Sequence, residues 1–460
     1  MSHFLISATQ KSSGKTTVSI GLSAELRRRG VAVQPFKKGP DYIDPLWLTR
    51  ASGRSCVNLD FHTQGRDEIV RSFVGAMSGA AMGLIEGNLG LFDGQDLHRG
   101  ADSNAALAIL LRAPVVLVID VQGLTRGVAP LLLGYQAFAP ELQFAGIVLN
   151  KVGGGRHGQR LREVVEHHTD FRVLGTIARD SHLGIAERHL GLIPSNEARQ
   201  AAAKIEEIRA CIADQVDVDA LLDRAQCSLP RRREPPAGGD EQMGTGLRIG
   251  IARDEAFGFY YPGDLSAFER AGARLVFFSP LRDRVLPEVD GLFLGGGFPE
   301  VMMDRLEANA PMRAAVRGFI ERDGPAYAEC GGLMYLSRSI RWRGRKAQMV
   351  GVIGADAVMG ERPVGRGYVR LRPTVDYPWP GLGREQIPCH EFHHSSLEGL
   401  DAGYRFAYRV ERGQGIDGRH DGILYRNLMA SYSHLRDVER DHWTERFLRF
   451  VALKRCLLTL

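Results

Sequence analysis

A lysine followed by two threonines comes directly after small residues near the N-terminus, as SGKTT at positions 13–17. Small residues let backbone N–H groups turn towards a phosphate, the lysine reaches the β- and γ-phosphates, and a threonine hydroxyl binds Mg²⁺. The pattern departs from the usual phosphate-binding loop at one point, because Thr9 stands where the first glycine is expected. It still predicts that ATP is bound by Ser13, Gly14, Lys15, Thr16 and Thr17.

Acidic residues follow two further apolar runs in this half of the chain. Asp41 and Asp44 lie beside Lys37 and Lys38 in the segment KKGPDYIDP, and Glu86 ends the next run. Loops at the carboxyl ends of parallel strands line the ligand crevice of an open sheet. A carboxylate placed there would hold Mg²⁺ beside the triphosphate, and the lysines would neutralise phosphate or substrate charge. A solvated charged loop is the alternative for the first segment.

Other polar residues come after the same kind of run. Asp93 lies directly before Gly94 in the loop EGNLGLFDG, where the alternative is an ordinary turn residue. Asp120 ends the run VVLVID in the manner of a Walker B aspartate, and Asn150 and Lys151 close the following run. A side chain that recognises the nucleotide base would fit at Asn150.

Cys330 is the candidate nucleophile of the C-terminal half. The segment YAECGGLMYL predicts a strand that delivers the thiol onto a tight turn beside a helix N-terminus, a setting that lowers the pKa of a thiol. A buried structural cysteine is the alternative. Backbone N–H groups of a glycine-rich loop can form an oxyanion hole, which predicts a role for Gly295, Gly296 and Gly297 of FLGGGFPE and for Gly331 after the cysteine.

A cysteine nucleophile of this kind needs a histidine as its general base. The histidines downstream of the cysteine lie in two segments, CHEFHHSS and MASYSHLR. They are His390, His393, His394 and His434, and all four are candidates on the residues alone.

The elements that must hold these residues are apolar runs that alternate with helix-length segments, which predicts an α/β fold with buried parallel strands. The run Phe4–Ile6 precedes the phosphate-binding loop, and Val18, Leu22 and Leu26 follow it at helical spacing up to Gly30. A helix that starts at the loop points its N-terminal dipole at the anion. The further strands of this half are expected at Val31–Phe36, Met82–Glu86, Val115–Ile119, Phe144–Leu149 and Val173–Ile177.

The alternation stops near Ala225, and CSLPRRREPPAGGDEQMGTG has proline, glycine and charge but no apolar period. This stretch predicts a linker over residues 227–246, between a P-loop domain at 1–226 and a second α/β domain at 247–460. Strands of the second domain are expected from Leu247 (LRIGIAR) and at Arg274–Phe278, Gly291–Leu294 and Ala326–Glu329.

Length and composition fit two soluble domains of this kind. The chain has 460 residues, of which 44% are hydrophobic and 25% charged, and its formal net charge of +5 gives no sign of nucleic-acid binding. The sequence shows neither a secretory signal nor an apolar run long enough to span a membrane. Six scattered cysteines without a C-x-x-C pair argue against disulfides and structural zinc and are typical of the cytoplasm.

Taken together, these motifs resemble the cobyrinic acid a,c-diamide synthase family, whose members amidate acetate side chains of corrinoids and related tetrapyrroles with nitrogen from L-glutamine. The resemblance covers nearly the whole chain. It rests on GKTT, KKGPDYIDP, EG-x-x-GLFDG, NKVGGGRH, ERHLGL, FYYP, LGGGFPE, AECGGLMYL and ASY-x-H. It implies a dethiobiotin-synthetase-like ATP domain followed by a class I glutamine amidotransferase domain, and it allows a homodimer.

The resemblance also implies roles for individual residues. Cys330 would be the glutaminase nucleophile and His434 its general base, while Asp93 would handle a phosphorylated intermediate. Lys15 and Thr16 would hold the phosphates of ATP and Mg²⁺. The implied metal site consists of Thr16, Asp41, Asp44 and Glu86, and the implied tetrapyrrole site of Lys38, Asp41, Tyr42, Ile43 and Asp44.

Two departures from the family leave questions open. His434 and Leu435 are followed by Arg436, so no acid stands two positions after the histidine, and the third member of the catalytic triad is open. Asn88 and the segments DSNAALA and TRGVAPLLLGYQAF resemble a branch thought to amidate sirohaem, so the ring of the substrate is open too. The alternative functions are cobyric acid synthesis and nucleotide-dependent association by a partitioning-type P-loop ATPase with an inactive glutaminase fold.

Overall fold

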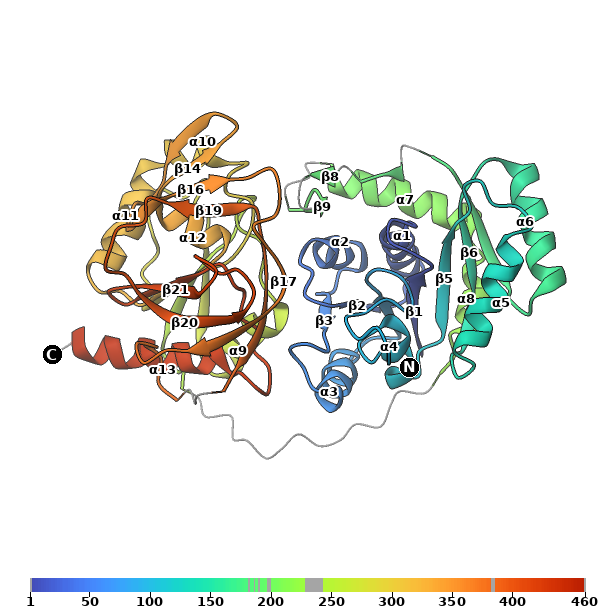
Figure 1. Cartoon of the computed structure of the whole chain (residues 1–460), viewed down its shortest axis with the longest axis horizontal. Helices are drawn as coiled ribbons and strands as arrows, with labels where there is room; N and C mark the ends of the chain where they lie inside the picture. The colour runs from blue at the N-terminus through green and yellow to red at the C-terminus, as the bar shows by residue number, and fades with distance from the viewer. Residues whose placement is uncertain are drawn as a thin grey trace. The chain divides into compact units, whose positions relative to one another are not determined.

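The chain forms two compact units, Met1–Pro236 and Ala237–Leu460 (Figure 1). In this computed structural model the described residues are 2–180, 183–185, 187–188, 191–196, 200–227, 243–381 and 385–458. The linker expected at 227–246 falls largely on residues 228–242, which lie outside the described residues. Its boundaries, and those of the domains at 1–226 and 247–460, therefore stay a prediction.

A parallel sheet of seven strands forms the middle of the first unit, in the order β3-β2-β4-β1-β5-β6-β7. Its strands are buried on both faces, which explains why they read as nearly continuous apolar runs. Every strand expected in this half is confirmed, and the short β3 is an addition. The bounds are β1 Ser2–Ala8, β2 Val33–Lys38, β3 Val57–Leu59, β4 Met82–Glu86, β5 Val115–Asp120, β6 Phe144–Val152 and β7 Val173–Ala178.

Helices cover both faces of this sheet (Figure 1). They are α1 Lys15–Arg28, α2 Ile43–Ser52, α3 Arg66–Ala76, α4 Asn104–Leu111, α5 Val128–Phe138, α6 Gly155–His168, α7 Ala201–Gln215 and α8 Val218–Arg224. Along β1, Phe4 and Ile6 pack into one core with α1, α2, α7 and α8, whereas Leu5 packs into a second core with α3 to α6. The first unit is thus a three-layer α/β/α fold. The motif ERHLGL contributes the short pair β8 Glu187–Arg188 and β9 Gly191–Leu192, and its residues 189–190 lie outside the described part.

The second unit has a nine-stranded mixed sheet in the order β11-β10-β12-β13-β22-β21-β20-β17-β18, and a four-stranded sheet in the order β15-β14-β16-β19. The four strands expected from sequence are confirmed as mutually parallel strands, and β22 is also parallel to the last of them. They are β10 Arg248–Ala252, β11 Arg274–Phe278, β12 Gly291–Leu294 and β13 Ala326–Glu329. The remaining strands are β14 Ser337–Trp342, β15 Arg345–Gln348, β16 Ile353–Met359, β17 Gly365–Pro373, β18 Ile387–His393, β19 Ser395–Glu398, β20 Arg405–Arg412, β21 His420–Tyr425 and β22 Leu428–Ser431.

The helices among the described residues of the second unit are α9 Pro262–Arg270, α10 Met303–Ala308, α11 Ala310–Glu321, α12 Gly331–Leu336 and α13 Trp443–Leu458. Short α12 directly follows β13, so it begins where the candidate nucleophile stands. In the part of the chain that the structure describes, no helix is both long enough and apolar enough to cross a membrane.

Candidate functional site

The loop between β1 and α1 has the backbone that a phosphate-binding loop needs. Ser12 and Gly14 take φ angles of 62° and 93°, and α1 begins directly after them at Lys15. The side-chain amide of Asn150, near the end of β6, donates a hydrogen bond of 2.8 Å to the carbonyl of Ser13. A Cβ on Gly14 would overlap this amide, so the position requires glycine.

Asn150 and Lys151 brace this loop. Lys151 Nζ lies 3.0 Å from the carbonyl oxygen of Ser12 and 2.6 Å from Asp120 Oδ2. Asp120 is therefore paired with a lysine rather than with Thr16, and its contacts do not support the expected Walker B role. The Asn150 amide is used within the loop, so its contacts do not support base recognition, and ATP binding by Asn150 stays a prediction.

Acids from two elements meet beside Thr16. Its hydroxyl donates to Glu86 Oε1 over 2.8 Å and lies 3.4 Å from Asp44 Oδ2. Strand β2 brings Lys37 between the same two acids, with Nζ 2.7 Å from Glu86 Oε1, 2.5 Å from Asp44 Oδ2 and 3.8 Å from Asp41 Oδ2. The structure thus gathers the four predicted metal-site residues around the ammonium of a lysine.

Burial and charge oppose each other in this cluster. Burial raises the pKa of Glu86, and burial together with the charge of Asp44 raises that of Asp41 to about 7. Burial acts in the same direction on Asp44, but the ammonium of Lys37 outweighs it and lowers the pKa. Burial alone would lower the pKa of Lys37, yet Asp44 and Glu86 hold it well above its ordinary value. Lys37 is therefore a fixed cation among three acids.

The oxygen atoms of the cluster are of the chemical type that Mg²⁺ prefers. Thr16, Asp44 and Glu86 offer the hard oxygen donors that this ion prefers, and Glu86 Oε2 is a buried atom without a hydrogen-bond partner among the described residues. Within the same described part, no group of three or more His, Cys, Asp or Glu side chains is arranged to hold a metal ion. Lys37 meets the charge of the acids instead, so metal binding here stays a prediction.

Two further lysines contact the loop that follows β4. Lys15 Nζ donates to the carbonyl of Leu89 over 2.6 Å, and Lys38 Nζ donates to Asn88 Oδ1 over 3.0 Å. Burial, and for Lys15 also the charge of Lys37, lowers the pKa of both lysines to about 8. An anionic partner, such as a phosphate or a carboxylate, would stabilise each ammonium.

Asn104, in the segment DSNAALA, holds the same loop against β1. Its Nδ2 lies 2.5 Å from the carbonyl oxygen of Asn88, 2.9 Å from that of Gly90 and 3.0 Å from Ser7 Oγ. This role of Asn104 was not predicted from sequence, although a polar side chain at the start of an apolar helix could have indicated it. Asp93 is exposed and accepts from the N–H of Gly90 over 2.8 Å, which is the turn role weighed as its alternative. A role with a phosphorylated intermediate stays a prediction.

The residues expected at the tetrapyrrole belong to, or lie next to, the lysine cluster, which is Lys37 with its three acids. Tyr42 is 8% exposed and directly precedes α2. The N–H of Ile43 donates to Asp41 Oδ1 over 2.8 Å, which satisfies a free donor at the start of this helix. Substrate binding by these residues stays a prediction.

Cys330 joins β13 to α12 on a strained turn. Its φ of 45° and ψ of −98° are rarely adopted by L-residues, and its N–H donates to the carbonyl of Ser431 over 2.8 Å. The side chain is buried, and burial, reinforced by the charges of Glu300 and Glu329, raises the pKa of the thiol. The expected lowering of this pKa is therefore wrong, because burial outweighs the dipole of the short α12 and the two acids act in the same direction as burial. A thiol with a raised pKa needs a base to become a nucleophile.

The glycine-rich loop after β12 approaches both the cysteine turn and His434. A Cβ on Gly331 would lie 2.9 Å from the backbone nitrogen of Gly297, and one on Gly296 would lie 2.6 Å from His434 Cε1. The N–H of Gly295 donates to the hydroxyl of Tyr260 over 2.9 Å. The contacts of Gly295 therefore do not support a place in an oxyanion hole. The candidate donors that stay are Gly296, Gly297 and Gly331.

Of the four histidines, His434 approaches the glycine-rich loop, and its role as the base stays a prediction. Its ring faces the glycine-rich loop, its N–H donates to the carbonyl of His390 over 2.8 Å, and the two rings stack with centroids 4.8 Å apart. The Nδ1 atoms of His393 and His394 contact main-chain oxygen atoms at 2.8 Å and 3.3 Å.

A carboxylate that the sequence analysis missed lies beside this histidine. Glu329 Oε2, at the end of β13, is 3.3 Å from His434 Nδ1. Glu329 Oε1 accepts from the hydroxyl of Tyr327 over 2.7 Å and from the N–H of Leu435 over 2.8 Å. Arg436, at the position where an acid was sought, packs over an aromatic ring instead. This acid directly precedes Cys330 in the chain, rather than following His434.

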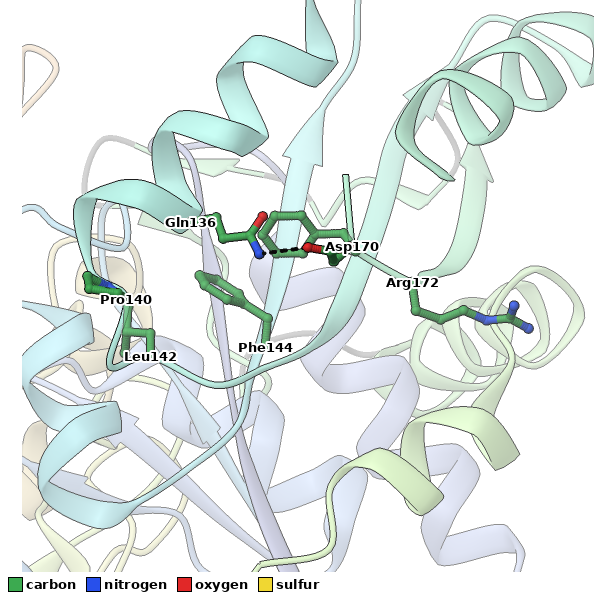
Figure 2. Close-up of a pocket in the computed structure, with 7 residues that line it drawn as sticks. Gln136, Pro140, Leu142, Phe144, Asp170 and Arg172 are labelled. Atoms are coloured by element: carbon green, nitrogen blue, oxygen red, sulfur yellow. Dashed lines mark hydrogen bonds between the residues drawn. The ribbon is translucent and has the colours of Figure 1, made fainter. Parts of the chain in front are cut away.

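A hollow of about 290 Å³ in the first unit lies apart from these residues (Figure 2). It is formed at the end of α5 and just before β6 and β7, whereas the phosphate-binding loop follows the carboxyl end of β1 in the same parallel sheet. The hollow is therefore at the opposite edge of the sheet and takes no part in the candidate site. It is lined by Gln136, Pro140, Leu142, Phe144, Asp170, Phe171 and Arg172.

Two family models match the chain, one in each unit. The CobQ/CobB/MinD/ParA nucleotide binding domain matches residues 4–192, and the CobB/CobQ-like glutamine amidotransferase domain matches residues 248–440. The first match contains the phosphate-binding loop and the lysine cluster. The second contains the cysteine, the glycine-rich loop and the four histidines.

Relatives of known name are similar along nearly the full length. A cobyrinate a,c-diamide synthase of Magnetococcus marinus is 46% identical over 450 residues, which are 97% of this chain and 96% of that protein. The one of Methanosarcina acetivorans is 39% identical over 461 residues, 94% of this chain and 92% of that protein. The solved structure of PurLQS from Thermotoga maritima covers 46% of this chain and 99% of its own, at 15% identity and a TM-score of 0.35, a likeness that carries no argument.

Proposed function

The chain belongs to the cobyrinate a,c-diamide synthase family, and we propose that it uses ATP and glutamine to amidate the a and c acetate side chains of cobyrinic acid. The observation that carries this proposal is that the similarity spans both units, so a phosphate-binding loop and a cysteine–histidine site occur in one chain. A nucleotide-dependent switch would need the loop but not the cysteine.

Activation of the acetate is the first chemical task, because a carboxylate has no adequate leaving group for attack by ammonia. Transfer of the γ-phosphoryl group of ATP to the acetate gives an acyl phosphate and ADP. Lys15 would neutralise charge on the transferred group. Mg²⁺, held by Thr16, Asp44 and Glu86, would supply further positive charge to the phosphates. Ammonia then attacks the acyl carbon, phosphate leaves, and an amide results.

Ammonia for this step would come from glutamine in the second unit. Cys330 Sγ attacks the amide carbon of glutamine, while His434 accepts the thiol proton and passes it to the departing nitrogen. The products are ammonia and a glutamyl thioester, which water hydrolyses to glutamate and the free thiol. The N–H groups of Gly296, Gly297 and Gly331 would stabilise the oxyanion of each tetrahedral intermediate.

Sirohaem is the second candidate substrate. Asn88, one of the residues that departs from the corrinoid pattern, accepts a hydrogen bond from Lys38, which is expected at the substrate. A different residue at position 88 would therefore change the contacts of Lys38, and with them the way in which this lysine meets the substrate. Sirohaem and cobyrinic acid both carry acetate side chains beside propionates, so the same amidation chemistry applies to either ring.

The deciding experiment gives the purified chain ATP, Mg²⁺ and glutamine with an isotopically labelled amide nitrogen, together with cobyrinic acid, hydrogenobyrinic acid or sirohaem. Mass spectrometry then reads the label in each tetrapyrrole. We expect two labelled amides on cobyrinic acid. Label on sirohaem alone would assign the second candidate. No labelled product, with glutamine hydrolysis and ATP hydrolysis intact, would refute the tetrapyrrole substrate class.

We also propose a cytoplasmic enzyme that binds neither membrane nor nucleic acid and that forms a homodimer, as the family resemblance allows. Its dependence on ATP and glutamine supports the cytoplasm, where both are abundant. Analytical ultracentrifugation of the full chain measures the assembly state directly.

A further inference from the structure

Glu329 is adjacent to the nucleophile in the chain and adjacent to the base in space. It directly precedes Cys330, and its Oε2 lies 3.3 Å from His434 Nδ1. We propose that Glu329 is the positioning residue of the glutaminase site, which orients the imidazole of His434 and stabilises the imidazolium that forms when His434 takes the proton of Cys330. This step rests on the glutamine hydrolysis proposed above.

The carboxylate of Glu329 is held in one orientation. Glu329 is 2% exposed, and its Oε1 accepts from the hydroxyl of Tyr327 over 2.7 Å and from the N–H of Leu435 over 2.8 Å. Burial raises the pKa of the Tyr327 hydroxyl well above its ordinary value, so this group stays a donor. With Oε1 fixed by two donors, Oε2 is presented to the imidazole.

This contact selects the tautomer that a general base needs. An ionised carboxylate can only accept, so the hydrogen of neutral His434 resides on Nδ1 and leaves Nε2 able to accept the thiol proton. The backbone of His434 is fixed as well, because its N–H donates to His390 and the two rings stack. Ring and backbone are therefore both oriented before glutamine enters.

The charge of Glu329 also acts on the thiol of Cys330. Together with burial and Glu300, it raises the pKa of the Cys330 thiol and so opposes a resting thiolate. Proton transfer would therefore accompany attack on glutamine, and the buried thiol would be protected from unwanted reaction in between.

The test compares two buried glutamates in the same unit. Glu329→Gln keeps the volume and an oxygen for the two donors, but it turns an NH₂ group towards His434 Nδ1. We expect kcat for glutamine hydrolysis to fall by on the order of 10²-fold or more, with KM little changed and ammonia-driven amidation retained. The matched control is Glu391→Gln. Glu391 is also 2% exposed, accepts hydrogen bonds from two backbone N–H groups, and has its Oε2 3.7 Å from His393 Nε2.

Retained kcat in Glu329→Gln, or equal losses in both variants, would overturn the proposal. If the unaltered chain does not hydrolyse glutamine, the proposed function fails instead. If Glu329→Gln also loses ammonia-driven amidation, nitrogen NMR of the unaltered protein with labelled histidine decides the matter. The signal of His434, assigned by its loss in His434→Gln, should show the Nδ1-protonated tautomer, and the Nε2-protonated tautomer would overturn the proposal.

Discussion

The ammonium nitrogen of Lys37 lies 2.7 Å from Glu86 Oε1, and both side chains are buried. The hydroxyl of Thr16, which is expected to bind Mg²⁺, donates to the same oxygen. Positive charge therefore reaches the acids of this site from within the chain. Mg²⁺ bound at these oxygens would have to share them with Lys37 or displace it, so we expect this lysine to affect both stability and metal affinity.

Removing this ammonium should destabilise the protein. In Lys37→Met, the buried Glu86 and the partly buried Asp44 lose their cation, and the free energy of unfolding should fall by roughly 3–5 kcal/mol at neutral pH without Mg²⁺. Lys204→Met is the control, because Lys204 forms a partly exposed pair with Glu207 on α7, at 2.7 Å. That change should cost about 1 kcal/mol or less. Urea unfolding of the full chain measures both, and equal losses would contradict the prediction.

The acids beside Lys37 should show opposite dependences on pH. The pKa of Asp41 is raised to about 7 in the folded chain, whereas it is about 4 in the unfolded chain. Between about pH 4 and pH 7 the folded chain therefore holds a proton that the unfolded chain has released, so stability falls as pH rises through this window. Asp41→Asn removes this loss, so its stability relative to the unaltered chain should increase across that window. The pKa of Asp44 is lowered, so the relative stability of Asp44→Asn should decrease as pH rises. Unfolding curves at several pH values test this, and parallel trends for the two variants would contradict it.

Two glycines that flank α1 test how the phosphate-binding loop is braced. Gly14 and Gly30 have φ angles of 93° and 79°, but a Cβ on Gly14 would overlap the amide of Asn150, whereas one on Gly30 meets no atom within 4 Å. Gly30→Ala should cost about 1–2 kcal/mol of stability and leave Mg-ATP binding intact. Gly14→Ala should abolish binding, as calorimetric titration would show. Equal affinities in the two variants would mean that the loop does not depend on this contact.

Most of the first unit follows from local patterns, but half of the larger sheet in the second does not. Val115–Asp120 is buried on both faces of its sheet and so reads as an unbroken apolar run. In β17, buried Val369 and Leu371 alternate with exposed Arg370 and Arg372. A strand with one face exposed to solvent has this alternation, but a charged loop can have the same sequence pattern. The four parallel strands β10 to β13 were therefore predicted. The antiparallel strands were not, and neither was β22, which is parallel to β13 but antiparallel to β21.

The site divides in the same way. Motifs that are continuous in sequence predicted the loop around Lys15 and the turn at Cys330. The contact between Glu329 and His434 joins residues 105 positions apart, because β13 pairs with β22 in a register that places Glu329 opposite Ser431. No local pattern records that register. The pKa of Cys330 could not be predicted either, since its direction depends on burial and on acids brought close by the fold.

Replacing the nucleophile should separate the two activities of the chain. Cys330→Ser keeps the turn but replaces the thiol by a poorer nucleophile, so glutamine hydrolysis should fall by about 10³-fold or more, whereas amidation driven by added ammonia should survive. Cys389→Ser, which alters another buried cysteine of the same unit, should retain both activities. Product amide and released glutamate are measured in parallel. Substantial glutamine hydrolysis in Cys330→Ser would remove Cys330 as the nucleophile, and loss of ammonia-driven amidation as well would show that chemistry in the first unit requires an intact cysteine site.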